Sequence, residues 1–174
     1  MTGHRMPELS GDGLVRLAEA ALTRPSTTPP SRRIPSLYAD PTSWSVLAAV
    51  DEAWARCPAG VRAAPEATGM VLVSAHGTTA TMTAIARAVP GGRLSPLRFA
   101  GASAGGPVSL VCLVHGFRGP TLVITAEPDE GHPAALTVAR HWLRTGAAGH
   151  VVAGLHQHDP HGHQVRCVVL GAQP

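Results

Sequence analysis

The 174-residue sequence has no lysine, few aromatic residues and no long apolar run. All 14 basic residues are arginine, spread from Arg5 to Arg166 without forming a stripe, and the formal net charge is only +3. Such a scattered, modest charge argues against nucleic acid as a partner. With aromatic residues at 3%, a core has to be packed closely from Ala, Val and Leu.

The apolar runs are no longer than a strand, and the N-terminal residues MTGHRMPELSGDG lack the apolar stretch of a signal peptide. We therefore expect neither a membrane span nor a leader, and a reducing bacterial cytoplasm as the compartment. Cys57, Cys112 and Cys167 are odd in number and form no CxxC pair. This excludes a disulfide framework and a zinc site built from cysteines.

Hydrophobic residues make up 44% of the chain and charged residues 14%, which is typical of one globular domain. In residues 1–37 we expect a short helix over Leu14–Leu22 and then a flexible segment rich in Pro, Ser and Thr. Residues 38–174 are expected to form the folded domain. Asp40 and Pro41 predict a helix start, with Asp40 as the N-cap and Pro41 at the first helical position.

From Gly69 onward, short apolar runs alternate with Ala-rich segments of helical character. This alternation predicts an α/β fold, with a five-stranded mixed sheet, an antiparallel last strand and helices on both faces. The expected strands are Met70–Ala75, Leu97–Ala100, Thr121–Thr125, His150–Leu155 and Gln164–Leu170, and the expected helices are Thr78–Val89, Val108–His115 and Pro133–Arg144.

Several short motifs recur in an order known from one enzyme family. The segment GFRGP (116–120) leads into TLVITA, then a turn, an Ala-rich helix ending at Arg144-Thr145-Gly146, and the strand HVVAGL. Over residues 38–171 this order resembles the nucleophile region of β-ketoacyl synthases of the thiolase superfamily. The resemblance implies one half of a thiolase-like fold, because the family carries two similar halves.

The resemblance also locates a missing residue. The family's nucleophilic cysteine falls on Glu127 when counted forward from Thr125-Ala126, and on Asp129 when counted back from Arg144. A carboxylate is a poor nucleophile toward a thioester, so we expect no condensing activity. The family likeness then implies an accessory or structural subunit of polyketide or fatty-acyl biosynthesis, comparable to a chain length factor.

Partners follow from the same likeness. The helix Pro133–Arg144 carries apolar residues on much of its circumference, and we expect another protein to cover it. The family pairs across the strand that corresponds to Thr121–Thr125. This implies a homodimer, or a heterodimer with a ketosynthase-like protein, and an acyl carrier protein as a further partner.

Two other interpretations of the polar clusters stay open. Asp129 or Glu130 can simply cap the helix that follows. Alternatively, Glu127 and Asp129 act as a general acid or base with His132, His76 or His115, which predicts an enzyme that hydrolyses, dehydrates or isomerises an acyl thioester.

Histidines concentrate in one segment near the C-terminus, HQHDPHGH (156–163). On two arms of a tight turn, His156, His158, His161 and His163 can converge on a divalent metal, because imidazole suits Zn, Ni and Cu. The alternative is a solvent-exposed turn. No organic cofactor is expected.

Overall fold

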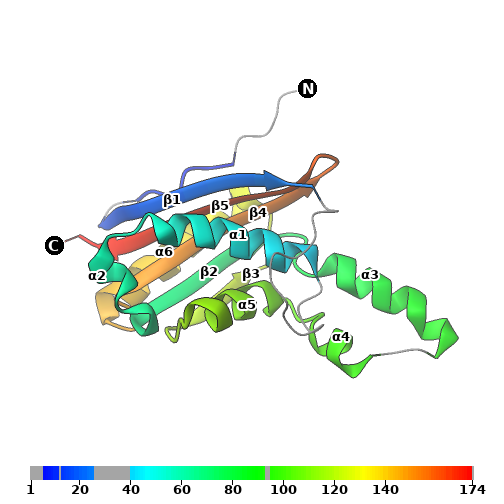
Figure 1. Cartoon of the computed structure of the whole chain (residues 1–174). Coiled ribbons are helices and arrows are strands. Elements are labelled where there is room, and N and C mark those ends of the chain that lie inside the picture. The colour runs from blue at the N-terminus through cyan, green and yellow to red at the C-terminus, as the bar shows by residue number, and fades with distance from the viewer. Residues whose placement is uncertain (1–5, 12, 26–39, 93–94, 174) are drawn as a thin grey trace.

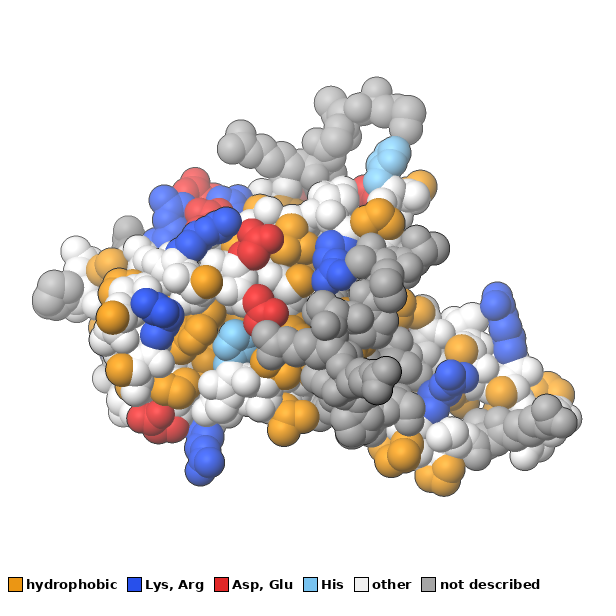
Figure 2. All heavy atoms as spheres, in the orientation of Figure 1, with side chains coloured by type: hydrophobic (Ala, Val, Ile, Leu, Met, Phe, Trp, Pro, Cys, Tyr) orange, Lys and Arg blue, Asp and Glu red, His pale blue; other side chains and the backbone are white. Residues whose placement is uncertain are grey.

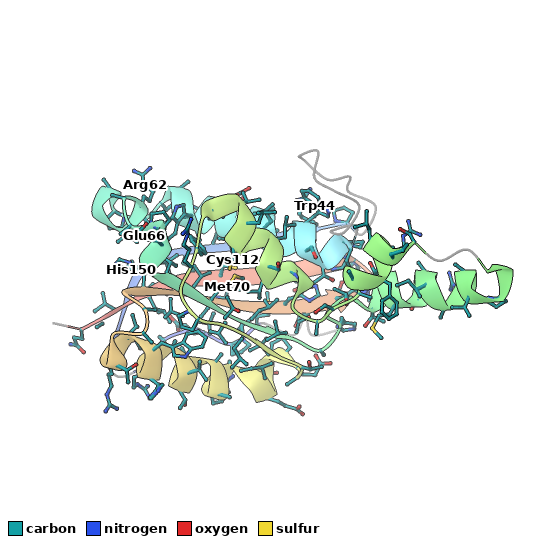
Figure 3. The ribbon with its side chains drawn as sticks, turned by 90° about the horizontal axis from the view of Figure 1, so that it is seen from below. Trp44, Arg62, Glu66, Met70, Cys112 and His150 are labelled. Carbon is teal, nitrogen blue, oxygen red and sulfur yellow. The ribbon has the colours of Figure 1, made fainter. Side chains whose placement is uncertain are left out.

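A computed structural model describes residues 6–11, 13–25, 40–92 and 95–173 of the chain. One mixed sheet, with the strand order β1-β5-β4-β2-β3, lies between helices on its two faces (Figure 1; Figure 3). The strands are β1 (Leu14–Arg24), β2 (Thr68–Ser74), β3 (Thr121–Ile124), β4 (His150–Asp159) and β5 (Gly162–Ala172). The helices are α1 (Pro41–Ala55), α2 (Ala59–Arg62), α3 (Thr79–Ala88), α4 (Pro96–Ala100), α5 (Gly106–His115) and α6 (Pro128–Thr145), with 3-10 turns at Pro65–Ala67 and Val89–Gly91.

The strand β2 lies inside the sheet, next to the edge strand β3. It pairs in parallel with β3 on one side and β4 on the other, and every one of its residues is buried. Met70 and Leu72 face one layer of helices, whereas Val71 and Val73 face the other, as the twofold alternation of a strand requires. The expected α/β fold with helices on both faces is confirmed.

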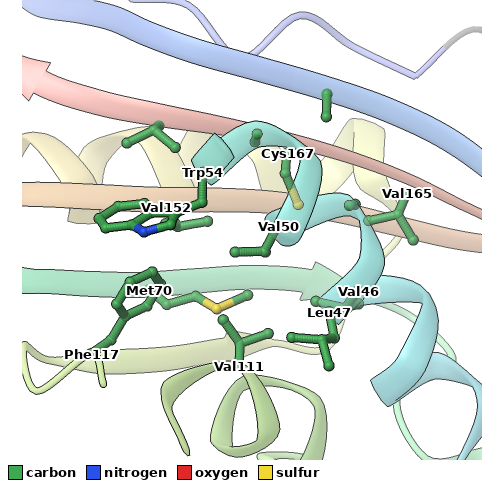
Figure 4. Close-up of a cluster of buried hydrophobic side chains, with 14 of the residues drawn as sticks. Val46, Leu47, Val50, Trp54, Met70, Val111, Phe117, Val152, Val165 and Cys167 are labelled. Atoms are coloured by element: carbon green, nitrogen blue, oxygen red, sulfur yellow. The ribbon is translucent and has the colours of Figure 1, made fainter. Parts of the chain in front are cut away.

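One face of the sheet is covered by α1 and α5. Asp40 begins α1 as expected, since its Oδ1 accepts a hydrogen bond from the Thr42 backbone N–H at 2.9 Å. Apolar residues at helical spacing along α1 then pack against the strands (Figure 4). The cluster in Figure 4 includes Val46, Leu47, Val50, Trp54, Met70, Val111, Phe117, Val152, Val165 and Cys167.

The opposite face is covered by α6, which is longer than expected. Its inner side buries Ala135, Leu136, Ala139 and Leu143 against the sheet. The outer side is exposed and largely polar, with Thr137, His141 and Arg144. The prediction of an apolar outer surface on this helix is therefore wrong, because its apolar residues lie on the side that faces the sheet.

Two other expectations need correction. Residues 14–22 belong to strand β1, which pairs antiparallel with β5, and Arg166 on β5 donates to Glu19 Oε1 at 2.7 Å. The Ala- and Leu-rich sequence has helical propensity, but the ladder to β5 and the burial of Ala18 and Ala20 outweigh it. The sheet thus extends across the expected boundary at residue 37.

The expected strand Leu97–Ala100 is the helix α4, which Ser95 caps by accepting from the Arg98 N–H at 3.4 Å. Ser95 followed by Pro96 is a helix start signal that outweighs the short apolar run. The expected count of five strands holds only because β1 takes the place of this segment. Of the Pro-, Ser- and Thr-rich segment, residues 26–35 lie outside the described residues.

Helices α3 and α4 form an arm that extends from one end of the sheet (Figure 1). Along this arm Met82 is 57% exposed, Leu97 55% and Phe99 68%. In Figure 2 this arm carries hydrophobic and basic side chains but no acidic ones. Among the described residues, no helix combines the length and the apolar character needed to cross a membrane.

The close approach of α6 to β2 generates a test. At Gly131 an added Cβ would lie 2.4 Å from Val73 Cγ1, and Val73 is fully buried on β2. We expect Gly131→Ala to lower the free energy of unfolding by about 1–3 kcal/mol, although alanine has the higher helix propensity. Urea denaturation measures this change.

Gly60 provides the matched control, because it lies in the helix α2 and an added Cβ meets nothing within 4 Å. Gly60→Ala should leave the stability unchanged or raise it. Equal effects of the two substitutions would contradict the packing argument.

Candidate functional site

The junction between β3 and α6 places the carboxylates at the surface. Glu127 is the N-cap residue of α6, but its exposed side chain makes no capping hydrogen bond, and Asp129 and Glu130 occupy the first turn. Carboxylates at this position interact favourably with the helix dipole. His132 lies beside them, with its Nδ1 3.1 Å from the backbone oxygen of Asp129.

Of the other two candidate catalytic histidines, His115 lies at the opposite end of β3 from these carboxylates. His115 precedes β3 whereas Glu127 follows it, so the four residues of the strand, about 13 Å, lie between them. The Nε2 atom of His115 lies 2.8 Å from Asp51 Oδ1, and its ring stacks on Phe117 at 5.2 Å. These contacts join α1 and α5 at the other end of the sheet. Of the three histidines offered as partners of Glu127 and Asp129, His132 lies beside these carboxylates, whereas His115 does not.

His76 instead belongs to a histidine cluster on the α1 face of the sheet, which also contains His156, His158 and His163. Ring centroids of His76 and His158 lie 5.7 Å apart, and those of His158 and His163 lie 4.5 Å apart. The cluster forms because β4 and β5 pair as a hairpin with His158 opposite His163, while His76 follows β2, the other neighbour of β4. Spacing along the hairpin predicted the meeting of His158 and His163, but only the sheet order brings His76 to them.

A chain of hydrogen bonds runs through the buried part of this cluster. Ser74 Oγ accepts from the Gly77 N–H at 2.9 Å and lies 2.7 Å from His156 Nδ1. His156 Nε2 in turn lies 2.9 Å from His163 Nδ1. Ser74 and His156 have no exposed surface and His163 has 5%. The two ring nitrogens of His156 are thus both engaged inside the protein.

Burial controls the charge of these rings. Burial, with the neighbouring imidazoles of His163, His76 and His158, lowers the pKa of His156 to about 3. Burial and His158 lower the pKa of His163 to about 4, although the Asp40 carboxylate acts in the opposite direction. Both rings are therefore neutral at pH 7, and each keeps one nitrogen lone pair.

His161 does not join the cluster. It lies at the exposed tip of the hairpin, where its backbone N–H donates to Asp159 Oδ1 at 2.8 Å. Of the expected set, His156, His158 and His163 therefore lie together, whereas His161 lies apart from them. As the rings stand, no three His, Cys, Asp or Glu side chains in the described ranges converge on a point that holds a metal ion.

A pocket of about 240 Å³ opens beside the cluster, between the start of α1, the start of α3 and the hairpin. Its lining residues are Pro41, Thr42, His76, Gly77, Thr79, Ala80, His158 and His163. The pocket lies on the α1 face, whereas α6 with its carboxylates covers the other face. The sheet therefore separates the two polar clusters.

A larger groove of about 700 Å³ follows the edge of the sheet between α5 and β3. It is lined by Ala100, Gly101, Ser103, Gly105, Gly106, Val108, Ser109, Cys112, Thr121, Leu122 and Val123. Sequence reasoning missed this groove, although Leu122 on a strand and Leu113 on the neighbouring helix are apolar residues that remain 39% and 63% exposed.

All three cysteines are free and none lies near the start of α6. Burial raises the pKa of Cys57 and of Cys112, and it raises the pKa of Cys167 to about 12. A thiol that stays protonated at neutral pH is a weak nucleophile. The described residues thus contain no activated cysteine.

The buried histidines predict that acid destabilises the fold. In the unfolded chain these groups titrate near pH 6.5, so below that pH the unfolded state binds more protons than the folded state. The stability contribution is complete above pH 6.5 and is lost as the pH falls toward 4. We expect the free energy of unfolding to drop by about 2 kcal/mol per buried histidine between pH 7 and pH 5.

Urea denaturation at both pH values measures the drop. His163→Asn should reduce it, whereas His161→Asn, at the exposed tip of the same hairpin, should not. A drop that is the same in both variants would show that other groups cause it.

Comparison with known proteins gives the architecture a precedent. No known sequence family profile matches the chain, and no curated protein matches its sequence. The ishigamide ketosynthase/chain length factor matches its fold with a TM-score of 0.69 at 15% identity, covering 92% of this chain and 62% of that one. A β-ketoacyl synthase from Burkholderia phymatum STM815 matches with a TM-score of 0.70 at 12% identity, covering 92% and 59%.

A third match is a type II polyketide synthase acyl carrier protein in complex with its ketosynthase, with a TM-score of 0.66 at 11% identity. The match covers 92% of this chain and 62% of that one, so in each of these three cases the chain spans less than two thirds of the known structure. The chain has the thiolase-like α/β fold of ketosynthases and chain length factors.

Proposed function

We propose that this protein is a non-condensing, ketosynthase-like subunit that pairs with itself or with a ketosynthase in polyketide or fatty-acyl biosynthesis. One observation carries the proposal. At the start of α6, where the family resemblance puts the nucleophilic cysteine, the chain has the exposed carboxylates Glu127 and Asp129. A carboxylate does not replace a thiolate in thioester exchange, whereas the fold around it is retained.

The edge of the sheet supports the pairing. Among the described residues β3 pairs with β2 alone, and its other side borders the groove along α5. An exposed edge strand offers unpaired backbone groups to another chain. The exposed Leu122 and Leu113 add apolar area there. One solved structure of the same fold is described as a ketosynthase/chain length factor.

The positive charge of the arm formed by α3 and α4 favours an acidic partner. Arg87 and Arg98 lie on α3 and α4, and the sequence has no Asp or Glu from Thr68 to Ala126. A surface of one charge sign attracts a partner of the opposite sign. We infer that an acyl carrier protein docks here; a solved structure of this fold contains such a carrier in complex with its ketosynthase.

Pairing through β3 predicts the effect of a charge at this edge. Light scattering at micromolar concentration should show a dimer of this chain, or a heterodimer after co-expression with a ketosynthase encoded beside it. Leu122→Arg should shift the protein to monomer, because a buried, unpaired charge is costly at an interface. Thr137→Arg on the exposed side of α6 is the control and should change nothing.

A monomer under both conditions would contradict the pairing. A dimer that Leu122→Arg leaves intact would contradict the use of β3, because the edge is then not in the interface.

The non-condensing role predicts that the carboxylates do no chemistry. Glu127→Ala and Asp129→Ala should leave the condensing rate of the co-purified ketosynthase unchanged, because both side chains are exposed. The measurement is thioester consumption by the complex. Loss of turnover in either variant would instead favour the alternative, an enzyme that processes an acyl thioester with these carboxylates.

A further inference from the structure

The histidine cluster consists of the side chains that bind metals most often, and three of them line one pocket. Three imidazoles from three different segments line one pocket: His76 after β2, His158 on β4 and His163 on β5. Histidines buried only for packing need not share a pocket wall, and a pocket of about 240 Å³ has room for an ion and a water molecule.

The spacing of two of the three ring pairs fits a shared ion. When imidazole nitrogens bind one tetrahedral zinc at about 2.1 Å, neighbouring ring centroids lie roughly 5 Å apart. The observed separations are 5.7 Å for His76 with His158 and 4.5 Å for His158 with His163. Convergence of the three nitrogens requires rotation of the rings, because they do not meet at one point as they stand. His158 is exposed and His76 partly so, which leaves space for this rotation.

The hydrogen-bonded chain behind the pocket supplies the support that metal ligands need. A ligating histidine normally bonds through its second nitrogen to a partner that fixes its orientation. His163 Nδ1 lies 2.9 Å from His156 Nε2, and His156 Nδ1 lies 2.7 Å from Ser74 Oγ. This chain leaves His163 Nε2 for the pocket, where it has no hydrogen-bond partner among the described residues.

Two further features favour a cation. His76 Nδ1 is buried and has no hydrogen-bond partner among the described residues, which is costly for a polar atom. The nearby carboxylate of Asp40, which acts electrostatically on His163, adds negative charge. That carboxylate already accepts from the N–H groups of Thr42 and Thr81 at the starts of α1 and α3, so these helix ends do not form an anion site.

We propose that His76, His158 and His163 bind one divalent zinc ion, with His156 and Ser74 as the supporting chain and the fourth position open to water. The ion joins the β4–β5 hairpin to the segment between β2 and α3. This set differs from the one that the hairpin sequence suggests, since His76 takes the place of His161 and His156 only supports. The site is independent of the pairing surface at β3.

Metal titration of tag-free protein after chelator treatment tests the proposal. Calorimetry with Zn²⁺ should give one ion per chain, and Co²⁺ should give the visible absorption of a four-coordinate site. His76→Ala and His158→Ala should each weaken Zn²⁺ binding by more than about 100-fold, because each removes a direct ligand. His156→Gln should weaken it by about 10- to 100-fold, because it removes the support of His163.

His161→Ala is the matched control, because it removes an exposed histidine from the same hairpin, and it should leave affinity and stoichiometry unchanged. Circular dichroism without metal shows which variants remain folded, and the exposed position of His158 makes His158→Ala the decisive one. Binding of several weak ions that survives His76→Ala and His158→Ala would mean adventitious surface binding and would overturn the proposal. So would a loss of affinity in His161→Ala equal to that in His158→Ala.

Discussion

Burial of β2 on both faces is the constraint from which the other features follow. Because Met70 and Leu72 must be covered on one side and Val71 and Val73 on the other, α1 with α5 and α6 have to lie on opposite faces of the sheet. The loop after β2 then stays on the α1 face, next to the β4–β5 hairpin, while the turn after β3 leads into α6. The histidine cluster and the helix that carries the carboxylates thus lie on opposite faces of the sheet.

The two polar clusters differ in their exposure to solvent. Glu127 and Asp129 stay exposed at the end of a helix and keep access to water. His156 and His163 are enclosed and hold their neutral forms through burial and mutual contact. The fold therefore carries exposed carboxylates at the start of α6 and a largely buried group of imidazoles on the α1 face of the sheet.

The sequence predicted the parts that depend on local signals. Asp40-Pro41 marked the start of α1, and the apolar segments after Gly69 gave β2, β3, β4 and β5 in order. It did not predict β1, because an Ala- and Leu-rich segment has helical propensity and only the ladder to β5 makes it a strand. It did not place His76 with His158 either, since their meeting depends on which strands are neighbours in the sheet.

The position of β1 has a consequence for the order of folding. Residues 14–24 pair with residues 163–172, so the edge strand made early in synthesis finds its neighbour only when β5 has left the ribosome. Until then Leu14, Leu17 and Leu22 have no sheet to pack on, and their own helical propensity can govern the segment. Contacts of such long sequence separation slow folding. The ladder between β1 and β5 therefore forms only after β5 has been synthesised.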